Sequence, residues 1–346
     1  MKTMNGLALL KNGTTDDLEV RHDLPLPACR EDEVLIRVSA STLNRVDQVI
    51  IRGYPGLTLK FPHVLGADIA GEIAELGASV TGWKVGDKVS VYPLVACQVC
   101  ALCKEGKPNL CERFNYFGMH RPGGYAEYVS VPARNLASLP PGVDPADAAS
   151  IGVSGITALH ALNMNPDLKA GSRVMVWGAT GGVGTLLIQL AKLRKLEVIA
   201  TTRQASEADG LRDLGAEHVF DSGDESIVDR VRSLFPSGVD QVIDYVGPAT
   251  FPRSFQLLKK GGTMTLCGIL TGVETQLNIH QTYFRHLRIQ GVYLGTQAEY
   301  LELLGLLRTR EIVVPIAGRY NLSESKEALR SFAEDRHFGK VIIEPV

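Results

Sequence analysis

Several features are scarce or missing in this chain, and each absence excludes a class of protein. No apolar run approaches the roughly 20 residues that a membrane-spanning helix requires. The opening residues, MKTMNGLALLKNG, contain no small-residue cleavage site. We therefore expect neither a membrane anchor nor a signal peptide. The formal net charge is -2 and no basic run occurs, so nucleic acid and anionic membranes are poor candidate partners.

Cysteine is also scarce, but its distribution is informative. Four of the six cysteines lie in the single stretch CQVCALCKEGKPNLC, and Cys29 and Cys267 stand apart from it. A secreted scaffold of this length would spread its cysteines over distant loops. Clustered thiolates indicate a metal in a reducing compartment, so we expect a cytoplasmic protein.

The spacing of the clustered cysteines predicts a structural zinc site. A closed tetrahedral site with four thiolate ligands leaves no position for water or substrate. The turn KEGKPN brings the last cysteine back towards the first three. We therefore expect one structural zinc ion per chain, in a lobe of about residues 94–115, bound by Cys97, Cys100, Cys103 and Cys111.

The segment SRVMVWGATGGVGTLLIQLAKL is the strongest signal in the chain. It reads as a buried strand over 173–177, a glycine-rich turn and a helix, which is the context of a dinucleotide-binding turn. Gly178 allows the sharp turn, Gly181 lets the backbone approach a pyrophosphate, and Gly184 permits close packing of helix on strand. The expected cofactor-binding residues here are Gly178, Ala179, Thr180, Gly181, Gly182, Val183 and Gly184.

Strand-like runs recur after this turn and alternate with helical or polar stretches. Six strands in βα order between residue 173 and about residue 294 predict a doubly wound parallel sheet. Ligands bind at the carboxyl ends of the strands in such sheets. We therefore expect nicotinamide contacts from Gly247, Gly268 and Ile269.

The end of the second strand favours NADP(H) over NAD(H). NAD-binding folds place an acid about twenty residues after the glycines to hold the ribose 2′-hydroxyl. Here Thr202 and Arg203 stand in that region, and Arg203 offers a charge-assisted grip on a 2′-phosphate. Glu207 lies close behind, so NAD(H) stays open as an alternative.

The order of the motifs resembles the medium-chain dehydrogenase/reductase superfamily over nearly the whole chain. The motifs are DEVLIRVSASTLNRVD, FPHVLGADIAGEIAELG, GWKVGDKV, the cysteine lobe, GGYAEYVSVP, the glycine turn and FGKVIIEP. The resemblance implies an α/β protein in which a Rossmann domain (134–295) is inserted in a GroES-like, mostly β catalytic domain (1–133 and 296–346). The active site would lie in the cleft between the domains.

The departures from the family pattern concern the catalytic zinc. The positions that bind this ion in zinc alcohol dehydrogenases fall on Asn44, on Ala67 and near Val153. Asparagine is a poor zinc ligand, and alanine and valine are none. Asp68 remains, but one carboxylate cannot hold the ion. The sequence therefore predicts that this catalytic metal is absent.

Without a Lewis acid, conjugate reduction is easier than reduction of an isolated carbonyl, because the negative charge spreads onto an enolate. NRVDQVIIRGYPG resembles the quinone oxidoreductase and enoyl reductase branches of the superfamily. The resemblance implies Tyr54 as the proton donor, with a mere loop-filling role as the alternative. Asn44 and Asp47 either contact substrate or cofactor, or brace the loop. We expect reduction of an enone, enoyl thioester or quinone.

Two other functions stay open from the sequence. One is an alcohol dehydrogenase or carbonyl reductase with metal ligands from unexpected positions, and the other is a non-catalytic NADPH-binding protein. His63 and His160 lie among apolar residues without a second ligand at metal spacing, so we expect packing roles for them. The resemblance also implies a homodimer or homotetramer that pairs through the last Rossmann strand, near Tyr293.

Overall fold

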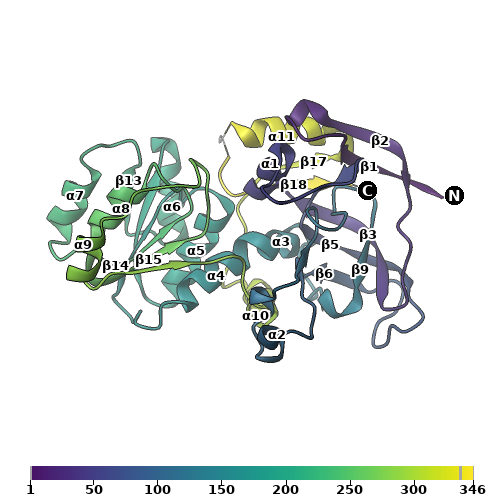
Figure 1. Cartoon of the computed structure of the whole chain (residues 1–346), viewed down its shortest axis with the longest axis horizontal. Coiled ribbons are helices and arrows are strands. Elements are labelled where there is room, and N and C mark those ends of the chain that lie inside the picture. Colours follow the sequence, from purple (N-terminus) through teal and green to yellow (C-terminus); the bar gives the residue numbers. More distant parts are fainter. Residues whose placement is uncertain (1, 335–336, 346) are drawn as a thin grey trace. The chain divides into compact units, whose positions relative to one another are not determined.

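The computed structural model describes residues 2–334 and 337–345, which form two compact units (Figure 1). The first unit runs to Ile156 and resumes at Thr296, and the second spans Thr157–Gly295. The second unit is thus inserted in the sequence of the first, and it ends at residue 295, where the sequence placed the end of the Rossmann domain. The first boundary lies later than the predicted residue 134.

The first unit is built on sheets that are antiparallel except for the parallel pair β17–β18. Its seven-stranded sheet has the order β10-β6-β5-β3-β18-β17, and β9 also pairs with β3. The strands are β3 (Glu33–Thr42), β5 (Asp68–Leu76), β6 (Lys88–Val91), β9 (Tyr128–Pro132), β10 (Leu136–Ser138), β17 (Ile316–Asn321) and β18 (Lys340–Glu344). A three-stranded sheet has the order β2-β1-β4, formed by β1 (Thr3–Leu9), β2 (Leu18–Pro25) and β4 (His63–Val64). β18 therefore brings the C-terminal segment beside β3, at the residues that precede Asn44.

The later domain boundary has a packing cause. The short helix α3 (Pro145–Ser150) follows β10 and buries Ala146 and Ala149 in one apolar cluster with Ala40, Ala70 and Ile342. Small side chains let this helix lie close on β3 and β5 of the first sheet. Residues 134–156 therefore belong to the first unit, because their apolar side chains are buried there.

The second unit contains the doubly wound sheet that the sequence predicted. Its six strands are parallel and have the order β13-β12-β11-β14-β15-β16. They are β11 (Arg173–Val176), β12 (Glu197–Thr202), β13 (His218–Asp221), β14 (Val239–Asp244), β15 (Leu258–Leu266) and β16 (Arg288–Gly291). The helices of this unit include α5 (Gly182–Leu193), α6 (Ala208–Leu214), α7 (Ile227–Leu234), α8 (Phe251–Leu257) and α9 (Ile279–Phe284). The order of the strands reverses at β11, which has β12 on one side and β14 on the other. Sheets of this kind bind ligands at such a switch point, at the carboxyl ends of the strands.

The remaining helices are α1 (Arg45–Arg52), α2 (Ala101–Lys104), α4 (Ile156–Asn163), α10 (Gln297–Thr309) and α11 (Ser325–Ala333). Among the described residues, no helix is both long and apolar enough to span a membrane.

Candidate functional site

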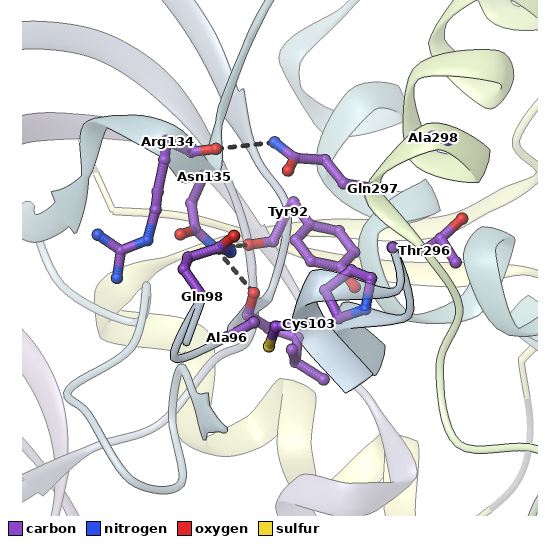
Figure 2. Close-up of a pocket in the computed structure, with 12 residues that line it drawn as sticks. Tyr92, Ala96, Gln98, Cys103, Arg134, Asn135, Thr296, Gln297 and Ala298 are labelled. Atoms are coloured by element: carbon purple, nitrogen blue, oxygen red, sulfur yellow. Dashed lines mark hydrogen bonds between the residues drawn. The ribbon is translucent and has the colours of Figure 1, made fainter. Parts of the chain in front are cut away.

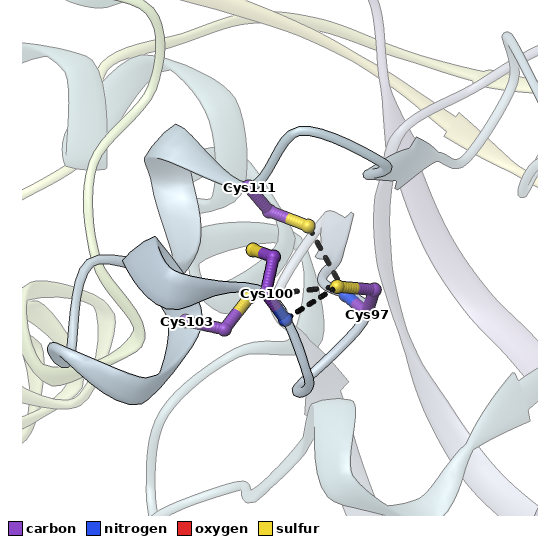
Figure 3. Close-up of side chains that lie close together, drawn as sticks. All are labelled: Cys97, Cys100, Cys103 and Cys111. Atoms are coloured by element: carbon purple, nitrogen blue, oxygen red, sulfur yellow. Dashed lines mark hydrogen bonds between the residues drawn. The ribbon is translucent and has the colours of Figure 1, made fainter.

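The four clustered cysteines converge in the first unit, as their spacing predicted (Figure 3). Their sulfur atoms all lie within 4.8 Å of one another, although the residues come from a loop, from α2 and from the segment after it. The backbone N–H groups of Cys97, Cys100 and Arg113 donate to cysteine sulfurs at 3.2–3.4 Å. Backbone donors also lower the pKa of Cys97 to about 6 and lower that of Cys100, whereas desolvation and the neighbouring thiols raise the pKa of Cys103 to about 12. The donor set fits a structural zinc ion.

The base of this lobe is fixed to the rest of its unit. β7 (Leu94–Val95) pairs with β8 (Asn115–Tyr116) on either side of the cysteines. Asn135 donates to the carbonyls of Tyr92 and Leu94, both at 2.9 Å, and Gln297 of α10 donates to the carbonyl of Arg134 at 2.8 Å (Figure 2). A cavity of about 280 Å³ lies between the lobe and α10, and its lining includes none of the predicted catalytic residues.

The glycine-rich turn has the geometry that the sequence predicted. Gly178 has a φ of +63°, a left-handed conformation that glycine adopts without strain. A Cβ on Gly184 would lie 2.5 Å from both the Ala179 carbonyl and the Tyr245 hydroxyl, so helix α5 packs closely on the turn. A Cβ on Gly181 would meet nothing nearer than 3.7 Å, so this face of the turn is open to a ligand. The turn therefore fits a pyrophosphate at the N-terminus of α5.

Two side chains that the sequence reading passed over hold this turn. Thr201 accepts from the N–H of Gly178 at 3.0 Å, and the hydroxyl of Tyr245 donates to the Gly178 carbonyl. At the end of β14, the buried Asp244 accepts from the N–H groups of Val246 and Gly247 at 3.0 Å each. These contacts set the strand ends where Gly247 and Gly268 are expected to meet the nicotinamide.

The end of β12 carries both side chains on which cofactor choice depends. Arg203 is exposed there. The carboxylate of Glu207 accepts from the Thr202 hydroxyl and from Gln204, the latter at 3.4 Å. Thr202 is therefore hydrogen-bonded to Glu207, the acid that leaves NAD(H) open as an alternative cofactor.

The three positions that correspond to catalytic zinc ligands offer no metal site. Ala67 is buried and apolar, and Val153 contributes its backbone N–H, which donates to Asp68 at 2.7 Å. The Thr42 hydroxyl and the Asn44 amide also donate to the Asp68 carboxylate, at 2.5 Å and 2.8 Å. Within residues 2–334 and 337–345, no second group of three or more His, Cys, Asp or Glu side chains is close enough to hold a metal ion. The donor set does not fit a catalytic zinc ion.

A fourth donor to Asp68 was not predicted from the sequence. Lys340, at the start of β18, reaches the carboxylate with its Nζ atom at 3.1 Å. The side chains of Lys340 and Asp68 are 3% and 0% exposed. The one sequence signal for this pair is a lysine placed directly before the apolar run VII in FGKVIIEP.

Asp47 lies in the same buried network. Its carboxylate accepts from the N–H of Asn44 at 2.8 Å and from the hydroxyl of Tyr125 at 2.7 Å. Burial raises the pKa of Asp47 to about 6, and the neighbouring Asp68 carboxylate adds to this effect. Lys340 and the two donors oppose it. Both Asn44 and Asp47 are buried and hydrogen-bonded as the loop-bracing alternative requires.

The raised pKa of Asp47 predicts a pH effect on stability. Because the folded-state pKa lies above the ordinary 3.8, protonation favours the folded state, and this contribution grows as the pH falls through 6. Relative to the Asp47→Asn variant, the wild type should gain about 1 kcal/mol of unfolding free energy between pH 7.5 and pH 5. Urea titrations at the two pH values measure the difference. Parallel shifts in both proteins would contradict the assignment.

Tyr54 begins the turn Tyr54–Leu57, in which the N–H of Leu57 donates to the Tyr54 carbonyl at 3.0 Å. Gly56 has a φ of +76°, which suits the third position of a type II turn after Pro55. The Tyr54 side chain is half-buried, and its hydroxyl has no hydrogen bond within the part of the chain that the structure describes. The hydroxyl is therefore not committed to bracing the loop, and Tyr54 stays a predicted proton donor.

The predicted packing role of His63 agrees with its contacts. Its Nε2 atom lies 3.1 Å from the Gly118 carbonyl, and burial lowers the pKa of its imidazole. His160 is half-buried on α4, in the second unit.

Comparisons with known proteins agree with both units. A model of the alcohol dehydrogenase GroES-like domain matches residues 30–141, and a model of the zinc-binding dehydrogenase domain matches residues 182–309. The NAD-dependent alcohol dehydrogenase of Sulfolobus acidocaldarius is 29% identical over 98% of this chain and 99% of its own length. The alcohol dehydrogenase of Geobacillus stearothermophilus is 28% identical over 94% of this chain and 95% of its own.

A solved structure of an NAD-dependent alcohol dehydrogenase is similar throughout. It is 31% identical, covers 99% of this chain and 100% of its own, and superposes with a TM-score of 0.94. This chain therefore shares its fold with that dehydrogenase over nearly its whole length.

Proposed function

This chain belongs to the zinc-type alcohol dehydrogenase-like group of the medium-chain dehydrogenase/reductase superfamily, and on that premise we propose an NADP(H)-dependent reductase of activated C=C bonds or quinones that works without a catalytic metal. The oxidoreductase class follows from the family. The observation that carries the finer proposal is the donor set around Asp68. Its carboxylate is saturated by protein donors, and two of the three ligand positions are apolar.

This donor set favours acceptors that delocalise their own charge. A bound reduced nicotinamide supplies a hydride. An isolated carbonyl then develops a full alkoxide, which a Lewis acid stabilises by several kcal/mol. An enone, enoyl thioester or quinone spreads the charge over a conjugated system, for which hydrogen-bond donors suffice.

The described residues supply the remaining steps. The N–H groups at the start of α5 bind the phosphates of the dinucleotide, and the open face of Gly181 lets them approach. The Oη atom of Tyr54 gives a proton to the reduced acceptor, which completes the addition of hydride and proton across the double bond.

A second candidate is an alcohol dehydrogenase or carbonyl reductase. The printed names of the relatives favour this candidate over reduction of a C=C bond, because they are alcohol dehydrogenases. The residues at the ligand positions favour the metal-free reaction. The two candidates differ in substrate, so a substrate panel separates them.

The test is NADPH oxidation with a panel of enones, quinones, enoyl thioesters and simple aldehydes, with primary and secondary alcohols in the reverse direction. The proposal expects turnover of at least one conjugated acceptor, with a kcat/KM at least tenfold above that of any simple aldehyde. Turnover confined to alcohols and aldehydes would establish the second candidate. Inertness towards the whole panel would support a non-catalytic nucleotide-binding protein.

NADP(H) as the cofactor rests on Arg203, which is exposed at the end of β12, and on the absence of an acid at Thr202. Replacing Arg203 by Ala removes a charge-assisted grip on the 2′-phosphate and should raise the Kd of NADPH roughly 10- to 100-fold. The Kd of NADH should change less than about twofold, since NADH lacks this phosphate.

Fluorescence titration of both nucleotides measures these constants. Arg212→Ala, at an exposed ion pair on α6, is the matched control and should change neither. Equal effects of Arg203→Ala on NADPH and NADH would contradict the cofactor proposal and would shift attention to Glu207.

We also propose that the protein forms a homodimer through β16. This strand ends its sheet, and the segment around it exposes Ile279, Tyr283 and Phe284. An unpaired strand edge beside apolar side chains is suited to pairing with a second copy. Sedimentation should give twice the chain mass.

A cytoplasmic location is consistent with the thiols of the lobe, which a reducing compartment keeps available for zinc.

A further inference from the structure

The ammonium group of Lys340 lies in a cage of oxygen atoms. Its Nζ atom lies 2.9 Å from Asn44 Oδ1 and 3.1 Å from the Leu43 carbonyl. It lies 3.1 Å from Asp68 Oδ2 and 3.3 Å from Ser154 Oγ. A neutral amine would turn its lone pair towards one of these acceptors, whereas an ammonium can donate three protons to them. The cage therefore binds a cation.

The segments of this cage are those that carry the three ligand positions. Asn44 is itself the first position, Asp68 follows Ala67, and Ser154 follows Val153. Ser154 lies in a π-helical turn (Ile151–Gly155), an irregularity that is frequent at functional sites. The lysine arrives from the C-terminal strand and is held in place by the N–H of Lys340, which donates to Pro315 at 2.8 Å.

We infer that the ammonium of Lys340 is the resident cation of this site: it takes the place of a catalytic metal, holding Asn44, Asp68 and the turn Ile151–Gly155 together and supplying a fixed positive charge. This inference rests on the proposed metal-free function. Lys340 acts through the residues that it binds, so it is a positioning residue.

A purely structural ion pair would give the same distances, so the test must separate stability from turnover. Lys340→Met keeps most of the side-chain volume and leaves the Asp68 carboxylate buried without its cation, which is strongly destabilising. The double variant Lys340→Met/Asp68→Asn removes both charges and relieves that penalty. Melting temperature, kcat and KM are measured for Lys340→Met, for Asp68→Asn and for the double variant, with whichever panel substrate the wild type turns over.

Melting temperature and kcat should respond differently in the double variant. Lys340→Met should lower the melting temperature by roughly 6–15 °C, and the double variant should recover most of this loss. The kcat of the double variant should stay roughly 10- to 100-fold below that of the wild type, with a smaller change in the Kd of NADPH. Lys340→Arg, which keeps the charge, should keep more activity than Lys340→Met. Lys84→Ala, at an exposed lysine of the same unit, is the control and should match the wild type.

Recovery of both melting temperature and kcat in the double variant would overturn the inference, because the pair would then be structural only. A wild type that turns over only alcohols would refute the proposed function but would leave this test in place, since the same variants can be assayed with those alcohols. Zinc content should stay at one ion per chain in every variant.

Discussion

Replacing Cys100 by Ser is expected to remove about 4–5 kcal/mol from the unfolding free energy, because a serine hydroxyl is a poor zinc ligand and the lobe loses its metal. The four sulfurs lie within 4.8 Å of one another, and the helical elements between β7 and β8 are short, namely α2 and the single turn Pro108–Leu110. Zinc analysis and thermal unfolding measure the two losses together.

The same variant separates a structural from a catalytic metal. Whatever protein remains folded should bind NADPH normally and keep its kcat, since the donor set of the lobe is closed. Cys29→Ser is the matched control, because Cys29 lies outside the lobe, and its thiol donates to the Glu33 carbonyl at 3.2 Å. A folded Cys100→Ser protein that binds the cofactor but cannot turn over would show that the structural assignment is wrong.

The second large effect is expected at Gly184. A Cβ there would lie 2.5 Å from the Ala179 carbonyl and 2.6 Å from Ala179 Cα, with the Tyr245 hydroxyl on the other side. Backbone cannot yield as a flexible side chain can, so Gly184→Val should push α5 away from the turn. We expect a loss of about 2–4 kcal/mol of stability and roughly 100-fold weaker NADPH binding.

Gly181 provides the contrasting variant. A Cβ at Gly181 meets only the Gly178 carbonyl, at 3.7 Å, so Gly181→Ala should leave the melting temperature nearly unchanged. It should still weaken NADPH binding, because the methyl group occupies the open face where the pyrophosphate approaches. Gly305→Ala on α10, where a Cβ meets nothing within 4 Å, should leave NADPH binding unchanged and raise the melting temperature slightly, because alanine is about 1 kcal/mol more favourable than glycine inside a helix. If Gly181→Ala bound NADPH as the wild type does, the phosphate would not lie at this turn.

The sequence predicted well those features that depend on neighbouring residues. The cysteine cluster and the strand–turn–helix at Gly178 are local, so their spacing predicts them without knowledge of the tertiary fold. The six parallel strands were also recognised, because each is a short apolar run. The first domain boundary was misplaced, because the burial of α3 depends on contacts with β3, β5 and β18 that spacing does not reveal.

The buried network around Asp68 was beyond the sequence for the same physical reason. Lys340 and Asp68 are 272 residues apart in the chain, and their approach depends on β18 pairing beside β3. Tyr125, which donates to Asp47, also comes from a distant segment. The sequence showed that the zinc-binding positions of the family fall on Asn44, on Ala67 and near Val153, which are unsuited to a zinc ion. It did not reveal that a lysine reaches the same segments.

We propose above all that this oxidoreductase binds one structural zinc ion and no catalytic one. Elemental analysis of the purified, active protein after dialysis against a mild chelator tests this claim most directly. The account predicts one zinc ion per chain, lost only when the cysteine lobe is disrupted. Two ions per active chain, with turnover that falls as the second is removed, would contradict it.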